Sequence, residues 1–89
     1  MHKSQKELKD EIIKASNDVL VGRVYVHYKS PDMRYEVKEL AVNTEHDNIC
    51  VIYQALYDEQ LLFVRSLEEW LDIVEKDGKQ VRRFTLEES

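Results

Sequence analysis

The sequence has little of the residues that staple a chain, break its secondary structure or carry it through a membrane: among 89 residues there are two glycines, one proline and one cysteine. The lone cysteine, Cys50, excludes an internal disulfide framework and a cysteine-based zinc site. No apolar run approaches the ~20 residues that span a bilayer, and the N-terminal MHKSQKELKDE lacks the apolar region of a signal peptide. We therefore expect one cytoplasmic globular domain.

Lysine and arginine are also in the minority, 13 against 18 aspartates and glutamates, which gives a net charge of −5. Strong binding to a nucleic acid backbone needs these cations gathered on one face, so the overall charge speaks against it. The charge is uneven, however, because residues 1–38 carry eight positive and six negative groups. The excess of positive charge in residues 1–38 keeps a second candidate function open. This is a nucleic-acid-associated accessory domain with a weak basic rim beside Tyr25 and Tyr35. The rim consists of Arg23, Lys29, Arg34 and Lys38.

Sequence motifs for catalysis and for metal binding are missing. There is no glycine-rich phosphate loop and no G-x-S-x-G, and the carboxylates gather on predicted helices and turns. His2, His27 and His46 lie far apart, and neither H-x-x-x-H nor C-x-x-C occurs, so we predict no metal site and no cofactor. His27 would be the only credible general base, which leaves a small hydrolase or transferase as the weakest candidate function.

What the sequence does contain begins with an amphipathic helix. Ser4 and Glu7 form a capping box, and the apolar residues that follow recur at helical spacing, so we predict a helix over residues 3–19. Its apolar stripe is narrow, and Ile13 lies off it. The helix therefore either docks on its own domain or lends its apolar side to a partner. The stripe consists of Leu8, Ile12, Ala15 and Val19.

Strands follow this helix. Residues 22–29 alternate between apolar and polar positions with period two, which predicts a half-buried strand. In the next strand the apolar phase slips by one residue between Val37 and Leu40, as a bulge or a sharp bend would produce. Residues 49–57 are apolar on nearly both faces and should form a central strand, and residues 60–65 form a fourth.

A second capping box, Ser66 with Glu69, predicts a short helix of about two turns. An Asp–Gly pair at residues 77–78 is a strong hairpin signal and leads into a last strand over residues 79–84. Together the elements describe a mainly β fold with two helices, a small antiparallel SH3-like barrel with an N-terminal helix appended. An open antiparallel sheet with both helices on one face is the alternative. The short helix presents on one face Leu67, Trp70, Leu71 and Val74.

Four segments form a recognisable set: residues 25–29 are Y-V-H-Y-K, residues 51–57 V-I-Y-Q-A-L-Y, residues 63–65 F-V-R and residues 83–84 R-F. In order and spacing they match the motifs Y-x-H-Y-K, V-x-Y-Q-x-L-Y, aromatic-V-R and R-F. The chain therefore resembles the bacterial family catalogued as domain of unknown function 1653. The resemblance runs over residues 22–84.

The resemblance implies an SH3-like barrel and implies no established activity, substrate or cofactor. We divide the chain accordingly into a helical extension, residues 1–21, and a barrel domain, residues 22–86. The sequence departs from the family pattern at two positions, because Ser30 stands where the family often has glycine and Ser66 where it usually has proline. Serine caps a helix well, so the second departure is compatible with the predicted short helix.

Tyr25, His27 and Lys29 share the polar face of the first predicted strand and lie about 7 Å apart along it. They suggest a site for an anionic or planar polar ligand, contacted by His27 and Lys29 and flanked by Tyr25. The simpler interpretation is a solvated strand face whose tyrosine and histidine pack against the N-terminal helix, because antiparallel sheets commonly leave one face wet. The sequence leaves both interpretations open.

Gln54 interrupts the apolar third strand, and Arg65 ends the fourth. A buried amide needs a hydrogen-bond partner, which Tyr28, Tyr57 or Arg65 would supply. Arg65 itself either pairs with a glutamate of the following helix, stacks on an aromatic ring, or holds a ligand carboxylate or phosphate. If Gln54 and Arg65 converge with His27 at one end of the barrel, the three form a ligand pocket.

The function that these observations favour is a non-catalytic binding or adaptor module for a small polar ligand or peptide. A protein partner is a further option through the N-terminal helix, and no membrane partner is indicated. The candidate ligand-binding residues are Tyr25, His27, Lys29, Gln54 and Arg65.

Overall fold

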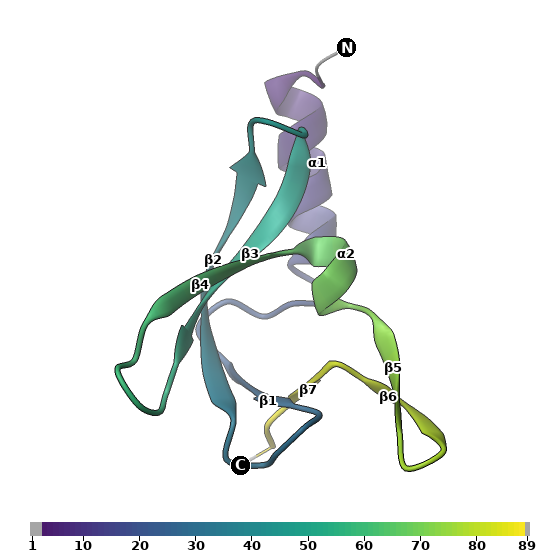
Figure 1. The fold of residues 1–89 in the computed structure, drawn as a ribbon. Helices are drawn as coiled ribbons and strands as arrows, with labels where there is room; N and C mark the ends of the chain where they lie inside the picture. The colour runs from purple at the N-terminus through teal and green to yellow at the C-terminus, as the bar shows by residue number, and fades with distance from the viewer. Residues whose placement is uncertain (1–2, 89) are drawn as a thin grey trace.

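The computed structural model describes residues 3–88 and folds them into seven strands and two helices (Figure 1). The N-terminal helix is α1 (Gln5–Ala15), and a single-turn helix, α2 (Leu67–Trp70), follows the fourth strand. The predicted mainly β fold with two helices is confirmed. The strands are β1 (Val24–His27), β2 (Arg34–Asn43), β3 (Asn48–Ala55), β4 (Leu62–Ser66), β5 (Ile73–Lys76), β6 (Lys79–Arg82) and β7 (Phe84–Leu86).

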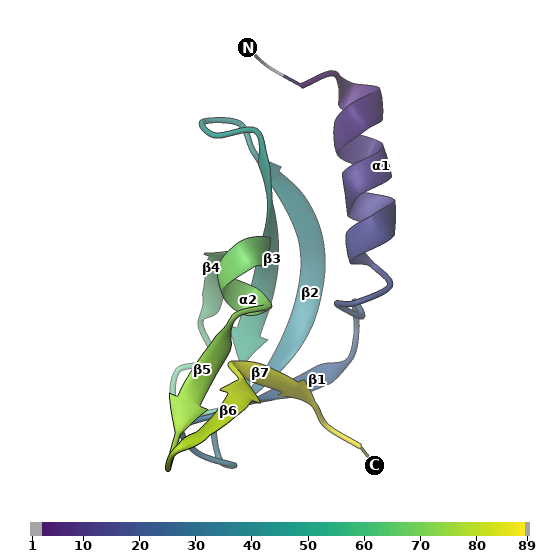
Figure 2. The ribbon, with the colours of Figure 1, turned by 90° about the vertical axis from the view of Figure 1, so that its right-hand side faces the viewer.

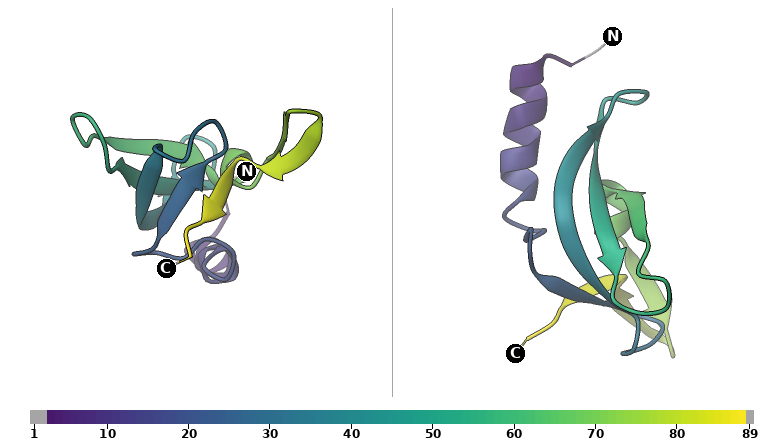
Figure 3. Two further views of the ribbon diagram at one scale, coloured as in Figure 1. Left: turned by 90° about the horizontal axis from the view of Figure 1, so that it is seen from below. Right: turned by 90° about the vertical axis from the view of Figure 1, so that its left-hand side faces the viewer.

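Five strands form one antiparallel sheet in the order β4-β3-β2-β1-β7, and β5 and β6 form a separate hairpin. The chain runs as a meander from β1 to β4, and β7 returns to pair with the free edge of β1. Figures 2 and 3 show that the sheet is strongly twisted and bent, with α1 lying alongside it. Within residues 3–88 no backbone ladder joins β4 to β7, so the sheet has two edges.

The predicted phase slip in β2 is a β-bulge. Val37 lies opposite Tyr53 and Leu40 opposite Val51, and the register shifts between them, so Lys38 is the extra residue. Without the bulge, Leu40 would turn to the opposite face from Val37. The extra residue therefore keeps the apolar side chains on both halves of this long strand directed into one core.

The helix α1 begins at the predicted cap, because the Ser4 hydroxyl accepts a hydrogen bond from the Glu7 N–H (3.1 Å). It ends at Ala15, earlier than predicted, where the sequence Ser-Asn-Asp favours turns over helix. Val19 is fully buried but reaches the core from the turn after the helix. Leu8 and Ala15 are buried where α1 contacts β2 and β3, so the apolar stripe packs on the chain's own sheet (Figure 2).

The helix α2 has its predicted cap, since the Ser66 hydroxyl accepts a hydrogen bond from the Glu69 N–H (3.2 Å). The prediction of a second helical turn is wrong, because the helix ends at Trp70 and Val74 lies in β5, where it pairs with β6. The hairpin turn between these strands has positive φ at Asp77 (53°) and Gly78 (79°), as the type I′ geometry of an Asp–Gly turn requires. Backbone pairing across this turn replaces the helix after Trp70.

The last predicted strand is two strands in the structure, interrupted at Arg83. The Arg83 N–H donates to the carbonyl of Asp72 (3.0 Å) rather than to a strand. Before this residue β6 pairs with β5, and after it β7 pairs with β1. Arg83 is therefore the point at which the chain leaves the hairpin and joins the main sheet.

The strand β1 turns the opposite face to the core from the one predicted. Tyr25 and His27 are buried, with 5% and 7% of their surface exposed, whereas Val24 and Val26 on the other face are half-buried. The prediction of a wet polar face is therefore wrong for Tyr25 and His27, and Lys29, beyond the end of the strand, is exposed. The rings face inward because the space between the sheet and α2 takes large aromatic side chains, which bury more apolar surface than valine.

Candidate functional site

The sheet brings side chains from distant segments onto one face, which we call the inner face. Residues directly opposite one another in an antiparallel ladder point to the same side. His27 lies opposite Phe84, Tyr53 opposite Phe63 and Val51 opposite Arg65. The matched motif segments in β1, β3, β4 and β7 thus converge on the inner face.

Phe84 is the centre of an aromatic cluster on this face. Three rings form edge-to-face pairs with it, at centroid distances of 5.1 Å for His27, 5.7 Å for Tyr53 and 5.8 Å for Tyr35. Its ring stacks on Trp70 at 3.7 Å with an angle of 6° between the ring planes. Edge-to-face and stacked pairs of this kind stabilise a core beyond the area that they bury.

Arg65 crosses the margin of the cluster. Its Nε donates to the Tyr53 hydroxyl (3.3 Å), and its guanidinium carbon lies 5.6 Å from the centroid of the Phe84 ring. The Nη1 group forms an ion pair with Glu69 of α2 (3.3 Å). The Arg65 side chain is 27% exposed and that of Glu69 59% exposed. Aromatic contacts thus fix the position of the guanidinium, while its outer edge meets solvent and an easily displaced carboxylate.

Arg83 is held from the same helix. Its Nε donates to the backbone carbonyl of Glu69 (3.0 Å), and its Nη2 contacts the carboxylate of Asp72 (3.4 Å). Arg65 and Arg83 are therefore both tied to Glu69, one through the side chain and the other through the backbone. The helix α2, capped by Ser66, sets the position of both guanidinium groups.

His27 lies within the field of these cations. Burial, followed by the positive charges of Arg65, Lys29 and Arg83, lowers the pKa of His27 from 6.5 to about 4. Its Nδ1 accepts a hydrogen bond from the Lys29 N–H (3.2 Å), which closes the turn after β1. His27 is therefore neutral near pH 7. We call the group formed by His27, Lys29, Arg65 and Arg83 the cationic site.

Tyr35 adds a second buried polar group to the inner face. Its hydroxyl shares a hydrogen bond with that of Tyr57, and burial together with this bond raises the Tyr35 pKa well above its usual value of 10. The phenol is therefore neutral at ordinary pH. The inner face combines neutral aromatic groups with cations at its margin, an arrangement suited to holding an anion rather than to transferring protons.

Three of the five predicted site residues lie near one another: the Lys29 N–H donates to His27, and His27 and Arg65 both lie against Phe84. Tyr25 lies beyond Phe84, edge-on to Trp70 at 5.5 Å. Its burial is compatible with a hydroxyl because that group accepts the Leu20 N–H (2.9 Å) and contacts the Asp18 carbonyl (3.5 Å).

Gln54 does not join the cationic site. It lies on the opposite face of β3 from Tyr53, and its Nε2 donates to the Gln60 carbonyl (3.1 Å) in the turn before β4. The predicted partners Tyr28, Tyr57 and Arg65 are therefore wrong. Gln54 stabilises the β3–β4 turn.

Sequence reasoning missed two residues of this region. Tyr53, which orients Arg65, lies one position before Gln54 in the matched motif, where the sequence pattern predicts only an apolar strand position. Arg83 is part of the closing R-F motif, which by itself predicts no role for the arginine. The sequence feature that could have indicated a role is that Arg83 directly precedes Phe84. Because Phe84 is buried, its neighbour in the chain lies at the margin of the aromatic cluster.

Other kinds of site find no support in the part of the chain that the structure describes. Among residues 3–88, no three histidine, cysteine, aspartate or glutamate side chains gather closely enough to hold a metal ion. Cys50 is buried in β3, as expected for a small apolar residue. In the same range no helix has both the length and the apolarity needed to cross a membrane.

Comparison with known proteins places these features in a family. A family model described as protein of unknown function (DUF1653) matches residues 23–86, which include all four motif segments. The chain is also similar to the crystal structure of a protein belonging to DUF1653 from Bordetella bronchiseptica, with a TM-score of 0.64 and 29% sequence identity. That similarity covers 75% of this chain and 86% of the other. No curated protein matches the sequence.

Proposed function

The chain belongs to the DUF1653 family of proteins of unknown function, and from this premise we propose that it is a non-catalytic binding module for a small polar ligand or peptide with an anionic group. The ligand binds at the cationic site. The observation that carries the proposal is the placement of Arg65, whose guanidinium is fixed by Tyr53 and Phe84 while its outer edge stays accessible. A planar fork held in this way is suited to a carboxylate or a phosphate.

The surrounding charges support an anionic ligand. The whole chain has a net charge of −5, yet Lys29, Arg65 and Arg83 all act on His27. In the free protein Glu69 pairs with Arg65 and Asp72 with Arg83, and both carboxylate side chains are more than half exposed. Exposed ion pairs of this kind contribute at most about 1 kcal/mol, so a ligand anion can displace Glu69 from Arg65 at little cost.

The two alternatives are weaker. Two of the four cations of the basic rim form ion pairs on the surface, Arg34 with Glu87 (2.7 Å) and Lys38 with Glu36 (3.0 Å), which reduces their attraction for a nucleic acid backbone. A hydrolase would need His27 as its base, but Nδ1 of that imidazole already accepts the Lys29 N–H.

The test is a titration of the ¹⁵N-labelled protein with inorganic phosphate and with succinate, followed by amide NMR. We expect saturable shifts at residues 27–29, 65 and 83, and a loss of affinity of about tenfold or more in Arg65→Gln. Arg34→Gln, which removes an exposed arginine outside the site, is the matched control and should bind as the wild type does. Thermal unfolding of Arg65→Gln checks that the fold survives the loss of the bond to Tyr53.

Equal affinity of the wild type and Arg65→Gln would show that the anion binds elsewhere. Absence of shifts with both anions would refute the proposed ligand class.

A further inference from the structure

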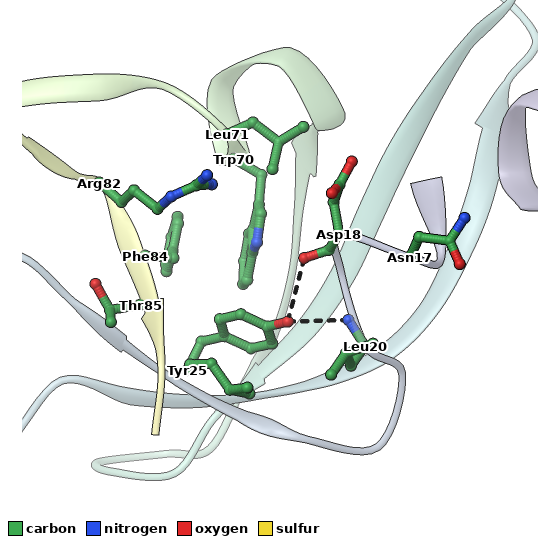
Figure 4. A pocket seen from close by; sticks show the side chains of 10 residues that line it. Asn17, Asp18, Leu20, Tyr25, Trp70, Leu71, Arg82, Phe84 and Thr85 are labelled. Atoms are coloured by element: carbon green, nitrogen blue, oxygen red, sulfur yellow. Dashed lines mark hydrogen bonds between the residues drawn. The ribbon is translucent and has the colours of Figure 1, made fainter. Parts of the chain in front are cut away.

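A cleft with different lining residues from the cationic site opens beside Trp70 and Phe84 (Figure 4). Its volume is about 260 Å³, and its walls come from the turn after α1, from α2 and from β1, β6 and β7. Tyr25, one of the predicted site residues, forms part of its floor. Ligand pockets commonly have volumes of about 300–1,000 Å³, so this cleft suits a molecule of amino-acid size.

The floor of the cleft contains a hydrogen-bond donor that has no protein partner within residues 3–88. Trp70 is only 2% exposed, and the nitrogen of its indole ring points into the space bounded by Asp18 and Tyr25 (Figure 4). Among residues 3–88 no acceptor receives a hydrogen bond from this N–H. The neighbouring Tyr25 hydroxyl, by contrast, already bonds to Leu20 and Asp18. A donor that faces a cleft and has no protein partner is available to a ligand that brings an acceptor.

The rim of the cleft carries opposite charges. The Asp18 side chain lies on one side and the Arg82 side chain on the other, both exposed (Figure 4). The two do not form an ion pair with each other within the described part of the chain. Leu71 and Leu86 add apolar side chains to the lining of the cleft. The cleft therefore offers, at separate points, cationic and neutral donors, an anionic acceptor and an apolar surface.

We infer that this cleft binds a small zwitterion, an α-amino acid with an aliphatic side chain. Its carboxylate accepts hydrogen bonds from the Trp70 N–H and from Arg82, and its ammonium group donates to the Asp18 carboxylate. The aliphatic side chain packs on Leu71 and Leu86. The inference is independent of the proposed function, because it concerns different residues and a different ligand class.

The chain has a single tryptophan, so its one indole N–H signal in the ¹H–¹⁵N spectrum reports on the cleft directly. The full-length protein is titrated to about 10 mM, well above a Kd of ~1 mM, with L-leucine, L-leucinamide and 4-methylpentanoate. Leucinamide lacks the carboxylate, and 4-methylpentanoate lacks the amine. We expect a saturable shift of the indole signal with leucine and binding at least about tenfold weaker with either analogue.

Two variants locate the charges. Arg82→Gln and Asp18→Asn should each weaken leucine binding by about tenfold or more, because each removes one charged partner. Lys79→Gln, which removes an exposed cation from the start of β6 in the same hairpin, should leave the affinity unchanged. Since Arg82 and Asp18 are exposed side chains, these changes leave the core intact.

Three outcomes would overturn the inference: no change of the indole signal with leucine, equal binding of leucine and either analogue, or unchanged affinity in both Arg82→Gln and Asp18→Asn. None of them bears on the proposed function, since the phosphate and succinate titrations report at residues 27–29, 65 and 83. Loss of anion binding in Arg65→Gln likewise leaves the leucine test untouched.

Discussion

His27 combines burial among aromatic rings with three nearby cations, and both effects favour its neutral form in the folded protein. Its pKa falls from 6.5 to about 4, through burial first and then through Arg65, Lys29 and Arg83. In the unfolded chain the imidazole returns to a pKa of about 6.5. Between these values the unfolded state binds more protons than the folded state, so the free energy of unfolding decreases as pH falls from 6.5 toward 4.

We expect His27→Gln to weaken this pH dependence. Glutamine retains an acceptor for the Lys29 N–H but does not titrate. On going from pH 7 to about pH 4.5, the wild type should therefore lose about 1–3 kcal/mol more stability than the variant. Urea unfolding at both pH values measures the difference. The contributions of the carboxylates to the pH dependence are the same in both proteins and cancel in the comparison. An equal loss in the two proteins would mean that His27 titrates in the fold as it does in water.

At the same scale, the sequence could indicate which residues carry chemistry but not which way each one points. Tyr25 and Val24 both suit a strand, and only the width of the space beneath Trp70 decides that the tyrosine faces inward. Gln54 was recognised as needing a partner, but that partner, Gln60, comes into reach only when the turn folds with positive φ at Gln60. Such choices depend on tertiary structure, which a periodic pattern does not contain.

Elements that begin or turn on a few adjacent residues were predictable. Ser4 and Ser66 cap their helices, and the bulge in β2 falls where the apolar phase slips. The lengths of the elements were less predictable. Val74 suits the apolar face of the short helix as well as a strand. It lies in β5 because a tight turn joins β5 to β6 and brings the two strands into register for pairing.

The hairpin turn gives a prediction at this scale. Gly78 has a φ of 79°, and a Cβ added there would meet no atom within 4 Å. Gly78→Ala should therefore be destabilising through the backbone alone, by about 1–2 kcal/mol. Native-state hydrogen exchange should show the amides of β5 and β6 exchanging about 5–30 times faster.

Lys79→Ala is the control for this change, because it truncates the adjacent exposed side chain and should alter exchange little. If the amides of β5 and β6 exchange at the same rates in Gly78→Ala and Lys79→Ala, the left-handed conformation at Gly78 does not stabilise the turn.

The whole molecule is organised around one core to which both helices contribute. The family model matches from residue 23, so α1 lies outside the matched segment. Yet Leu8, Ala15 and Val19 belong to the same buried cluster as Val51 of β3 and Trp70 of α2. We therefore predict that residues 3–21, which the sequence analysis assigns to a separate helical extension, fold and unfold together with the sheet.

Two substitutions in α1 test this prediction, because each replaces an aliphatic residue by alanine in the same helix. Leu8 is buried, whereas Ile13 is 56% exposed and lies off the apolar stripe. Leu8→Ala should lower the free energy of unfolding by about 2–3 kcal/mol, and Ile13→Ala should change it by no more than about 0.5 kcal/mol. Since alanine favours the helix in both variants, the difference between them isolates packing on the sheet.

The measurement follows urea unfolding by Trp70 fluorescence, which reports on the core, and by far-UV circular dichroism, which includes the helix. If α1 belongs to the cooperative unit, Leu8→Ala shifts both transitions to lower urea together. A fluorescence transition that stays in place while the dichroism changes would mean that the sheet folds without the helix. In that case the burial of Leu8 would stabilise only the attachment of α1, and its apolar stripe would be available to a partner whenever the helix detaches.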